Sequence, residues 1–353
     1  MKVLFLCTDV YGGHGGIALF NRELTSALSA HPRLAEAVVV PRLIRGELQA
    51  LPPKVTFLAH AARGNASYAR TIIKLMRQQF DLVICGHVNL LPVAGAVTND
   101  PLLITHGIDA WKPIASPFAL RVLERCRGVV AVSQLTLDRF LDWSRFPGKK
   151  FVLPNAIRAG LYGIRSKSDA LLDRWQLRGK RVLLTVGRVV AEERYKGFDE
   201  IIEVLPELPA DVVYLIAGGG SDLPRLKKKA GETGVADRVV FTGFFEESEK
   251  ADLYNLADVY VMPSRGEGFG FVFLEALASG VPAIGSRFDG GREALLGGEL
   301  GLLVDPSSPA EIRSAIMELL GRGERRIPER LEFFSYPNFE ARVHAIIDAL
   351  VSS

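Results

Sequence analysis

The sequence predicts an α/β protein made of two Rossmann-like, doubly wound domains that face each other across a cleft. Short runs rich in β-branched residues alternate with helix-patterned segments, which is typical of a parallel sheet with right-handed crossovers. The alternation starts again near residue 181, after a loop at 154–168 that is rich in glycine, basic residues and turn formers. A chain of 353 residues is long enough for two such domains.

In the first half, apolar runs and apolar residues at helical spacing mark the expected elements. Strands are expected at 3–7, 37–40, 55–59, 81–85, 101–105, 128–132 and 150–154. Helices are expected at 15–30, 64–79, 116–126 and 133–143. These elements make up a predicted N-terminal domain of residues 1–158.

The second half repeats the alternation and ends in a separate helical segment. Strands are expected at 181–187, 212–220, 238–243, 259–264, 281–286 and 301–305. They predict a C-terminal domain of residues 159–336. Residues 337–353 have helical apolar spacing and are expected to form a helix that crosses back to the N-terminal domain.

Charge is unevenly distributed along the chain, although the net charge is only +3. Residues 1–160 hold 19 basic and 10 acidic side chains, and the remainder holds 24 basic and 30 acidic ones. The two halves are therefore expected to have different partners, and the basic half suits a phosphate-bearing substrate or an anionic membrane surface. Nucleic-acid binding is not expected, because aromatic residues do not interleave with the basic ones.

Composition predicts a cytoplasmic protein. The N-terminus lacks the pattern of a signal peptide, and the longest weakly charged run, 82–97, is too short to span a bilayer. Cys7, Cys85 and Cys126 have neither disulfide nor metal-ligand spacing, so we expect buried free thiols in a reducing compartment.

The stretch RGEGFGFVFLEALASG, residues 265–280, carries the strongest chemical signal. A strand ends, a glycine-rich turn follows, and a helix begins near Gly270. Free N–H groups at such a helix start suit a phosphate, and Gly270, Phe271 and Val272 are the expected donors. Glu267 in the turn suits sugar hydroxyls, and Glu275 in the helix suits a ribose diol. Alternatively, Glu267 is solvated and Glu275 supports the first helical turn.

Two glutamates separated by seven residues, in EGFG…LEALASGVP, resemble the retaining family-4 glycosyltransferases of GT-B fold (glycosyl transferases group 1). Further matches occur in the family's order along nearly the whole chain. They are GGIALFNREL at 15–24, THG at 105–107, PNAI at 154–157, GRVVAEERYKGFDEII at 187–202, and then AGGGSD, TGF and GGREAL. The resemblance implies that the N-terminal domain binds the acceptor and the C-terminal domain binds the nucleotide sugar.

The resemblance also implies roles for single residues. Arg188 and Lys196 would neutralise the diphosphate, and Arg194 competes with Lys196 because the spacing from Arg188 is longer than the family's usual one. His106 would contact the donor sugar, and Glu267 would orient it rather than form a covalent intermediate. The remaining donor contacts would come from Gly15, Gly16, Gly187, Gly243, Phe244, Gly268 and Phe269.

The implied reaction moves a hexose from a nucleotide-diphosphate sugar to a glycan or lipid-linked acceptor with retention of configuration. Such a reaction belongs to polysaccharide biosynthesis. UDP-glucose is the first expectation for the donor and GDP-mannose the second. The sequence contains no Asp-x-Asp pair and no Cys/His cluster, so we expect no metal and no cofactor.

A basic stripe accompanies the expected helix at 64–79. Arg63, Arg70, Lys74 and Arg77 fall on one helical face, whereas apolar residues spread over much of the rest. Such a helix suits peripheral contact with the anionic inner face of the plasma membrane, although a solvated face is the more common reading of this pattern.

Three other functions remain open from the sequence. Gly13, Gly15 and Ala18 fit the fingerprint of an NAD(P)-dependent oxidoreductase, but residues intervene after the strand and no acidic residue ends the second strand. A GT-B enzyme that epimerises or phosphorolyses sugars is the second alternative, and a non-catalytic scaffold is the third.

Overall fold

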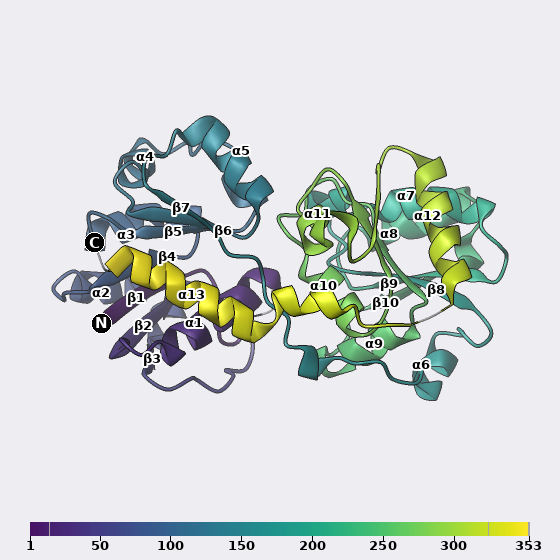
Figure 1. Ribbon diagram of the computed structural model, residues 1–353, viewed down its shortest axis with the longest axis horizontal. Coiled ribbons are helices and arrows are strands. Elements are labelled where there is room, and N and C mark those ends of the chain that lie inside the picture. Colours follow the sequence, from purple (N-terminus) through teal and green to yellow (C-terminus); the bar gives the residue numbers. More distant parts are fainter. Residues whose placement is uncertain (14, 324, 352–353) are drawn as a thin grey trace. The chain divides into compact units, whose positions relative to one another are not determined.

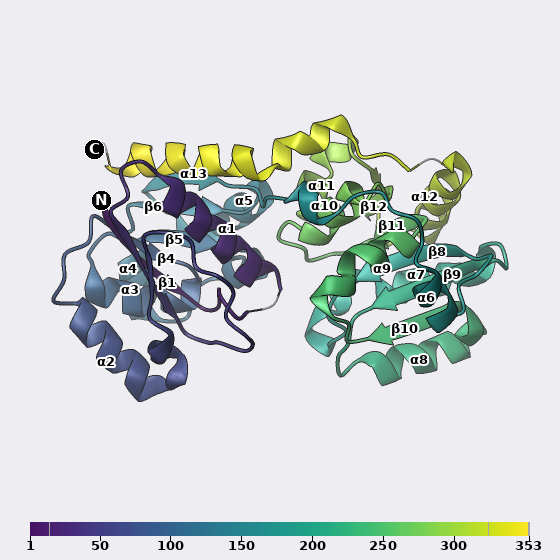
Figure 2. The same ribbon diagram turned by 90° about the horizontal axis from the view of Figure 1, so that it is seen from below.

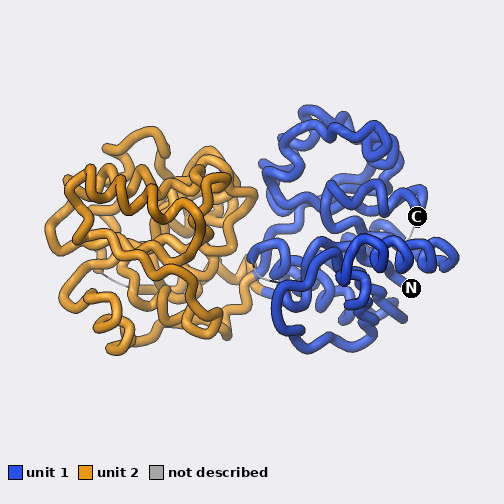
Figure 3. Tube along the Cα trace, turned by 180° about the vertical axis from the view of Figure 1, so that it is seen from behind, with its two compact units in different colours: residues 1–156, 336–353 blue, residues 157–335 orange. Residues whose placement is uncertain are grey.

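The computed structural model describes residues 1–13, 15–323 and 325–351, and it divides into two compact units (Figure 3). Unit 1 is made of residues 1–156 and 336–353, and unit 2 of residues 157–335. The sequence-based boundary lay after residue 158. The expected C-terminal helix is α13 (Tyr336–Val351), which belongs to unit 1, and residues 352–353 lie outside the described part of the chain.

Unit 1 contains a parallel sheet in the order β3-β2-β1-β4-β5-β6-β7. Its strands are apolar runs that are almost wholly buried in β1 and β4 to β6, as expected for a sheet covered by helices on both faces. The strands are β1 (Lys2–Cys7), β2 (Glu36–Pro41), β3 (Val55–Phe57), β4 (Leu82–Cys85), β5 (Leu102–Thr105), β6 (Gly128–Ala131) and β7 (Lys149–Val152).

Helices follow most strands of unit 1 (Figure 1). Local chemistry sets several of their ends: Ser133 caps α5 by accepting the backbone N–H of Thr136 at 3.1 Å, and Pro117 begins α4. The expected helix 64–79 is shorter than predicted. The helices are α1 (Gly16–Ala30), α2 (Asn65–Leu75), α3 (Leu91–Val97), α4 (Pro117–Leu123) and α5 (Gln134–Ser144).

Unit 2 contains a second parallel sheet, in the order β10-β9-β8-β11-β12-β13. Its strands are β8 (Arg181–Val186), β9 (Val212–Ala217), β10 (Val239–Gly243), β11 (Val259–Met262), β12 (Ala283–Ser286) and β13 (Leu302–Val304). Its helices are α6 (Asp169–Arg174), α7 (Phe198–Val204), α8 (Leu223–Glu232), α9 (Lys250–Leu256), α10 (Phe271–Ala278), α11 (Gly291–Ala294) and α12 (Pro309–Arg322).

Each sheet changes winding direction once. In unit 1 the reversal lies between β1 and β4, and in unit 2 it lies between β8 and β11. Connections on the two sides of such a point leave toward opposite faces, so a crevice opens at the carboxyl ends of these strands, where ligands of open α/β sheets bind. The loops after β1, β4, β8 and β11 are therefore the first places to examine for a site.

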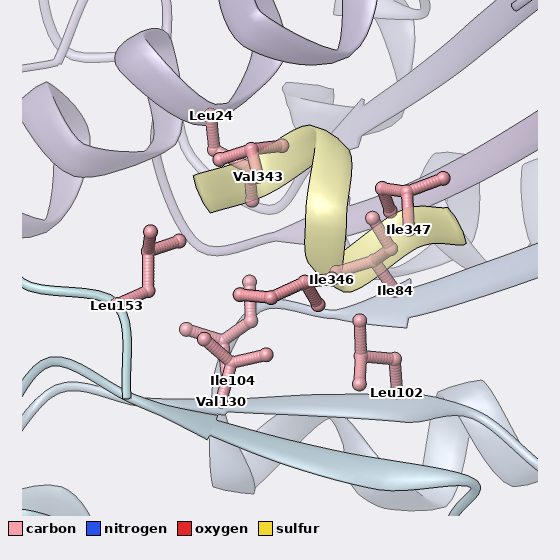
Figure 4. A pocket seen from close by; sticks show the side chains of 9 residues that line it. All are labelled: Leu24, Ile84, Leu102, Ile104, Val130, Leu153, Val343, Ile346 and Ile347. Carbon is pink, nitrogen blue, oxygen red and sulfur yellow. The ribbon is translucent and has the colours of Figure 1, made fainter. Parts of the chain in front are cut away.

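Helix α13 completes the core of unit 1 and runs beside α1 (Figure 2). The rings of Phe20 and Phe339 meet edge to face at 5.8 Å between their centroids, and Nε2 of His344 lies 2.9 Å from the carbonyl of Ala27. A small pocket beneath α13 is lined by apolar side chains alone (Figure 4). These side chains are Leu24, Ile84, Leu102, Ile104, Val130, Leu153, Val343, Ile346 and Ile347. No polar group converges there, so this gap belongs to the core.

Candidate functional site

The loops after β8 and β11 bring three predicted residues together in unit 2. Nζ of Lys196 lies 3.0 Å from Oε1 of Glu267. A Cβ on Gly187 would lie 3.3 to 3.5 Å from the end of the Lys196 side chain, so the glycine backbone and the ammonium are close neighbours. Both charged side chains are nearly buried, with 12% and 14% of their surface exposed. The pair therefore forms at the point where unit 2 is expected to hold a ligand.

Glu193, which sequence analysis did not single out, adds a second carboxylate to this pair. Its Oε2 lies 3.6 Å from Nζ of Lys196, and it also pairs with Arg188. Burial disfavours the Lys196 ammonium, yet the charges of Glu267, Tyr195 and Glu193 hold its pKa above the ordinary value. Lys196 is therefore a cation at neutral pH and is held in a fixed position by carboxylates on two loops.

The two arginines of the predicted site lie in different surroundings. Arg188 keeps 73% of its side chain exposed, so a phosphate can reach its guanidinium. Arg194 instead forms two hydrogen bonds with Asp222, at 2.6 and 3.1 Å, and Arg225 binds the same carboxylate. These arginines lower the pKa of Asp222 to about 2. Lys196 thus forms an ion pair with Glu267, whereas Arg194 forms one with Asp222 at the start of α8.

Asp289 fixes the backbone of the Glu267 loop. Its Oδ2 accepts hydrogen bonds from the Ser264 hydroxyl at 2.6 Å and from the Glu267 N–H at 2.9 Å, and its Oδ1 accepts one from the Gly291 N–H at 3.0 Å. Burial raises the pKa of this carboxyl group to about 7 despite those bonds. Sequence analysis missed Asp289, although an acidic residue between the end of β12 and a Gly-Gly turn is a visible signal.

The start of α10 has the geometry expected for phosphate binding. Gly270 precedes it with φ 94°, a conformation that favours glycine, and no side chain caps this end. The N–H groups of Phe271 and Val272 stand in the first turn, where an α-helix leaves its amides without intrahelical acceptors. The rings of Phe269 and Phe271 are buried, so these two predicted ligands can offer only their backbone. Gly268 lies in the same turn.

Glu275 lies inside unit 2, with 1% of its side chain exposed. One carboxylate oxygen accepts a hydrogen bond from Nζ of Lys250 at 2.6 Å, and the other accepts one from the Tyr254 hydroxyl at 2.6 Å. Both partners belong to α9, so Glu275 ties α10 to α9. It does not support the first turn of α10, and its contact with a ribose stays a prediction.

An exposed aromatic ring lies over a glycine-lined floor at the ends of β9 and β10. The ring of Phe244 is 85% exposed and lies directly over Gly219, where an added Cβ would come within 2.7 Å of it. Gly218 approaches so closely that a Cβ would lie 1.9 Å from the carbonyl oxygen of Gly187. Gly243, at the end of β10, precedes Phe244. A flat ligand ring has room to stack here.

In unit 1 the predicted residues follow β1 and β5. Gly15 has φ 91° with open space where a side chain would be, and Gly16 begins α1. Residue 14, in the same predicted glycine-rich turn, lies outside the described residues. Nε2 of His106 lies 3.0 Å from the carbonyl oxygen of Gly86, and burial lowers the pKa of His106 to about 4. His106 is therefore neutral at pH 7.

The surface of α2 combines basic and apolar side chains. Arg70, Lys74 and Ile73 are exposed on this helix. The exposed Arg63 precedes it, and the exposed Met76 and Arg77 follow its end at Leu75, so the predicted basic stripe lies only partly on α2. Tyr68, Ile72 and Leu75 attach the helix to the core of unit 1. Within the described part of the chain, no helix combines the length and the hydropathy that a membrane crossing needs.

Comparisons with known proteins agree with this architecture. A model of the family described as "Glycosyl transferases group 1" matches residues 171–330. A phosphatidyl-myo-inositol mannosyltransferase of Mycobacterium tuberculosis is 33% identical over 337 residues, which cover 90% of this chain and 85% of that protein.

A second relative is the GDP-mannose-dependent alpha-(1-6)-phosphatidylinositol monomannoside mannosyltransferase of Mycolicibacterium smegmatis. It is 32% identical over 235 residues, 63% of this chain. The match spans only 61% of that relative's length.

Two solved structures show the same fold. Anabaena Alr3699/HepE in complex with UDP superimposes with a TM-score of 0.76 at 19% identity, covering 99% of this chain and all of that one. Sucrose-phosphate synthase from Thermosynechococcus elongatus gives a TM-score of 0.71 at 21% identity, covering 100% and 97% of the two chains. With two Rossmann-like sheets, ordered motifs and a relative that matches nine-tenths of this chain, the protein belongs to the group 1 family of glycosyltransferases and has the GT-B fold.

Proposed function

We propose that the protein is a retaining family-4 glycosyltransferase that moves a hexose from a nucleotide-diphosphate sugar to a glycan or lipid-linked acceptor. The contact between Lys196 and Glu267 beneath Gly187 is the observation that carries this proposal. In this contact a fixed cation and a carboxylate lie in loops near the uncapped start of α10. The cation and the helix N–H groups suit the diphosphate, and the carboxylate suits the sugar hydroxyl groups.

In the proposed mechanism, charge builds up on the diphosphate as the sugar leaves. Lys196 and Arg188 offset that charge, and the N–H groups at the start of α10 add hydrogen bonds that strengthen with it. Glu267 orients the sugar through its hydroxyl groups. His106, which is neutral at pH 7, offers a ring nitrogen to the sugar rather than a positive charge. The acceptor hydroxyl attacks the anomeric carbon from the face that the diphosphate leaves. The bond from this carbon to the phosphate oxygen breaks, and the hydroxyl proton passes to that departing oxygen.

We propose GDP-mannose as the donor and a phosphatidylinositol-type lipid as the acceptor. Relatives named for these substrates support this choice over UDP-glucose, which the sequence placed first and which remains the alternative. Phe244 and its glycine floor are the proposed stacking surface for the base. The NAD(P) oxidoreductase alternative gains no support from the family match.

The deciding experiment screens GDP-mannose, UDP-glucose and other nucleotide sugars by thermal shift and by slow donor hydrolysis, with wild type, Glu267→Ala and Arg188→Ala. We expect one donor to raise Tm and to be hydrolysed by the wild type. Both variants should stay folded by circular dichroism and lose turnover. Full turnover in both variants would refute the site assignment, and no response to any nucleotide sugar would refute the function.

Two further properties belong to this proposal. Metal is not required, because the cationic side chains and α10 supply the charge that a divalent ion supplies elsewhere. The enzyme works in the cytoplasm and contacts the anionic inner face of the plasma membrane through α2, where its lipid-linked acceptor resides.

A further inference from the structure

Next to His106 lies a histidine–aspartate pair to which neither the sequence motifs nor the comparisons assign a role. His87 follows β4, and Asp109 lies in the short 3-10 segment Ile108–Ala110 after β5. Since β4 and β5 are neighbours in the sheet, their carboxyl ends bring the two side chains to the same edge. Both are largely buried, with 14% and 12% of their side chains exposed.

The hydrogen bonds of His87 determine where its proton lies. Nδ1 accepts the backbone N–H of Asn89 at 3.1 Å, which caps the 3-10 segment Val88–Leu90. A neutral ring therefore carries its hydrogen on Nε2. Burial lowers the pKa of His87, so the neutral ring predominates at pH 7. Nε2–H is thus a fixed donor.

The two carboxylate oxygens of Asp109 differ in their hydrogen bonding. Oδ1 accepts the backbone N–H of His106 at 3.1 Å. Oδ2 is buried and has no hydrogen-bond partner among residues 1–13, 15–323 and 325–351. It lies 4.0 Å from Nε2 of His87, which is too far for a direct hydrogen bond. A buried acceptor that receives no hydrogen bond costs free energy unless another group donates to it.

A separation of 4.0 Å is compatible with one oxygen atom that bridges the two atoms from the side. An oxygen atom placed about 2.8 Å from each of them accepts from Nε2–H and donates its own hydrogen to Oδ2. A hydroxyl group is both donor and acceptor, and it matches this arrangement, whereas an ammonium or a carboxylate matches only one side. The neighbouring His106 ring, 6.5 Å from the His87 ring, is the residue proposed to contact the donor sugar.

We propose that His87 and Asp109 form a subsite that binds one hydroxyl group of a polyol acceptor, an inositol or sugar ring. This assignment rests on the proposed function and adds the residues through which unit 1 recognises the acceptor. The backbone bond from His106 to Asp109 links the subsite to the donor-side histidine, so acceptor and donor sugar are positioned by neighbouring groups.

Two histidine replacements separate binding from structure. In His87→Asn, the side-chain oxygen takes the place of Nδ1 and keeps the cap on Asn89, but Nε2–H is lost. In His87→Gln, the amide nitrogen takes the place of Nε2 and keeps a donor, but the cap is lost. Asp109→Asn keeps an acceptor for the His106 N–H and replaces Oδ2 by an NH2 group, which faces another donor.

Kinetics with GDP-mannose and phosphatidyl-myo-inositol in mixed micelles provide the first test. We expect His87→Asn and Asp109→Asn to raise the KM for the lipid by about tenfold or more, because each replacement removes one hydrogen bond and leaves its buried partner unpaired. Donor hydrolysis without acceptor should stay within about twofold of the wild type, as should the KM of His87→Gln. An unchanged KM in both Asn variants would overturn the proposal, and so would an equal loss in His87→Gln.

A second test needs no turnover, so it separates this proposal from the proposed function. The ring-nitrogen NMR signals of His87 are followed in the full-length protein while myo-inositol or methyl α-mannoside is added. We expect the Nε2 signal to shift in the wild type and not in Asp109→Asn. No shift with either polyol would mean that the pair holds only water, and the proposal would fail even if donor hydrolysis were intact.

Discussion

Two basic residues in the loop after β8 are candidates for the cation that the proposed mechanism needs at the diphosphate. Lys196 and Arg194 are two positions apart, and the sequence left the choice between them open. The structure places Lys196 against Glu267 and holds Arg194 on Asp222. Lys196 lies beside Gly187 and Glu267, whereas Arg194 is held at the start of α8, so we expect Lys196 rather than Arg194 to meet the diphosphate.

Replacing each of these cations by methionine tests that conclusion. Lys196→Met should lower the rate of donor hydrolysis about 100-fold or more, because it removes a fixed charge beside the leaving group. Arg194→Met should leave the rate within about threefold. Both are measured as kcat with saturating nucleotide sugar, after circular dichroism shows native folding. The reverse order of effects would assign the role to Arg194.

The raised pKa of Asp289 predicts how the stability of unit 2 depends on pH. The folded pKa of about 7 lies above the ordinary value of 3.8, so the folded state holds this proton more tightly than the unfolded state does. Its contribution to stability is complete below pH 3.8 and is lost as pH rises toward 7. The free energy of unfolding should fall by at most about 1.4 kcal/mol per pH unit from this group.

Urea unfolding at pH 5, 6, 7 and 8 in a Trp111→Phe/Trp143→Phe background, followed by the fluorescence of Trp175 in unit 2, measures this slope. Asp289→Asn should flatten it, and it should also lower turnover, because an amide has only one acceptor oxygen for the Ser264, Glu267 and Gly291 donors that now bind two. Asp138→Asn, an exposed aspartate hydrogen-bonded to Gln134, serves as the control that leaves the slope unchanged. An equal slope in wild type and Asp289→Asn would contradict the prediction.

Among the elements, α13 shows how a segment far along the chain completes a unit that begins at the N-terminus. Ile347→Ala should destabilise unit 1 by about 2–5 kcal/mol, because Ile347 is 2% exposed and faces a wholly apolar lining. Urea unfolding in a Trp175→Phe background reports on unit 1 through Trp111 and Trp143. Ile73→Ala on α2 is the matched control, since Ile73 is 54% exposed. Equal midpoints for the two variants would show that α13 is not part of the core.

The exposed face of α2 makes a second element-scale prediction. The variant Arg70→Glu/Lys74→Glu should weaken binding to phosphatidylglycerol vesicles by about tenfold or more at low salt, because each basic side chain near an anionic surface contributes about 1 kcal/mol. Vesicle sedimentation measures the binding. The control Arg121→Glu/Arg125→Glu makes the same charge change elsewhere in unit 1. Wild type that stays free of the vesicles, or an equal loss in the control, would refute membrane contact through α2.

At the scale of the whole molecule, the proposal predicts turnover without metal. Excess EDTA should leave the rate of sugar transfer within about twofold of the untreated rate, since cationic side chains and the α10 amides supply the stabilising charge. Adding manganese or magnesium after EDTA is the control. An activity that disappears in EDTA and returns with manganese would show that a metal ion helps to bind the diphosphate.

Much of this architecture was predictable because it depends on local patterns. Hydrophobic runs and helical spacing identified the strands and most helices, and ordered glycine motifs located the loops at their carboxyl ends. The ends of elements were less predictable: α2 ends at Leu75, although the apolar spacing continues toward residue 79. Four residues were missed because the spacing of residues along the chain does not reveal their interaction partners. They are Glu193, Asp289, His87 and Asp109.

The sequence by itself determined two parallel α/β sheets, the family and the loops that carry the site, since periodicity and motif order are properties of neighbouring residues. The tertiary structure decided which of those residues meet. Glu267 and Lys196 are 71 positions apart, and Glu275 and Lys250 are 25 apart. Such contacts depend on strand order and on which side chains burial forces into pairs, because a charge removed from water must find a partner.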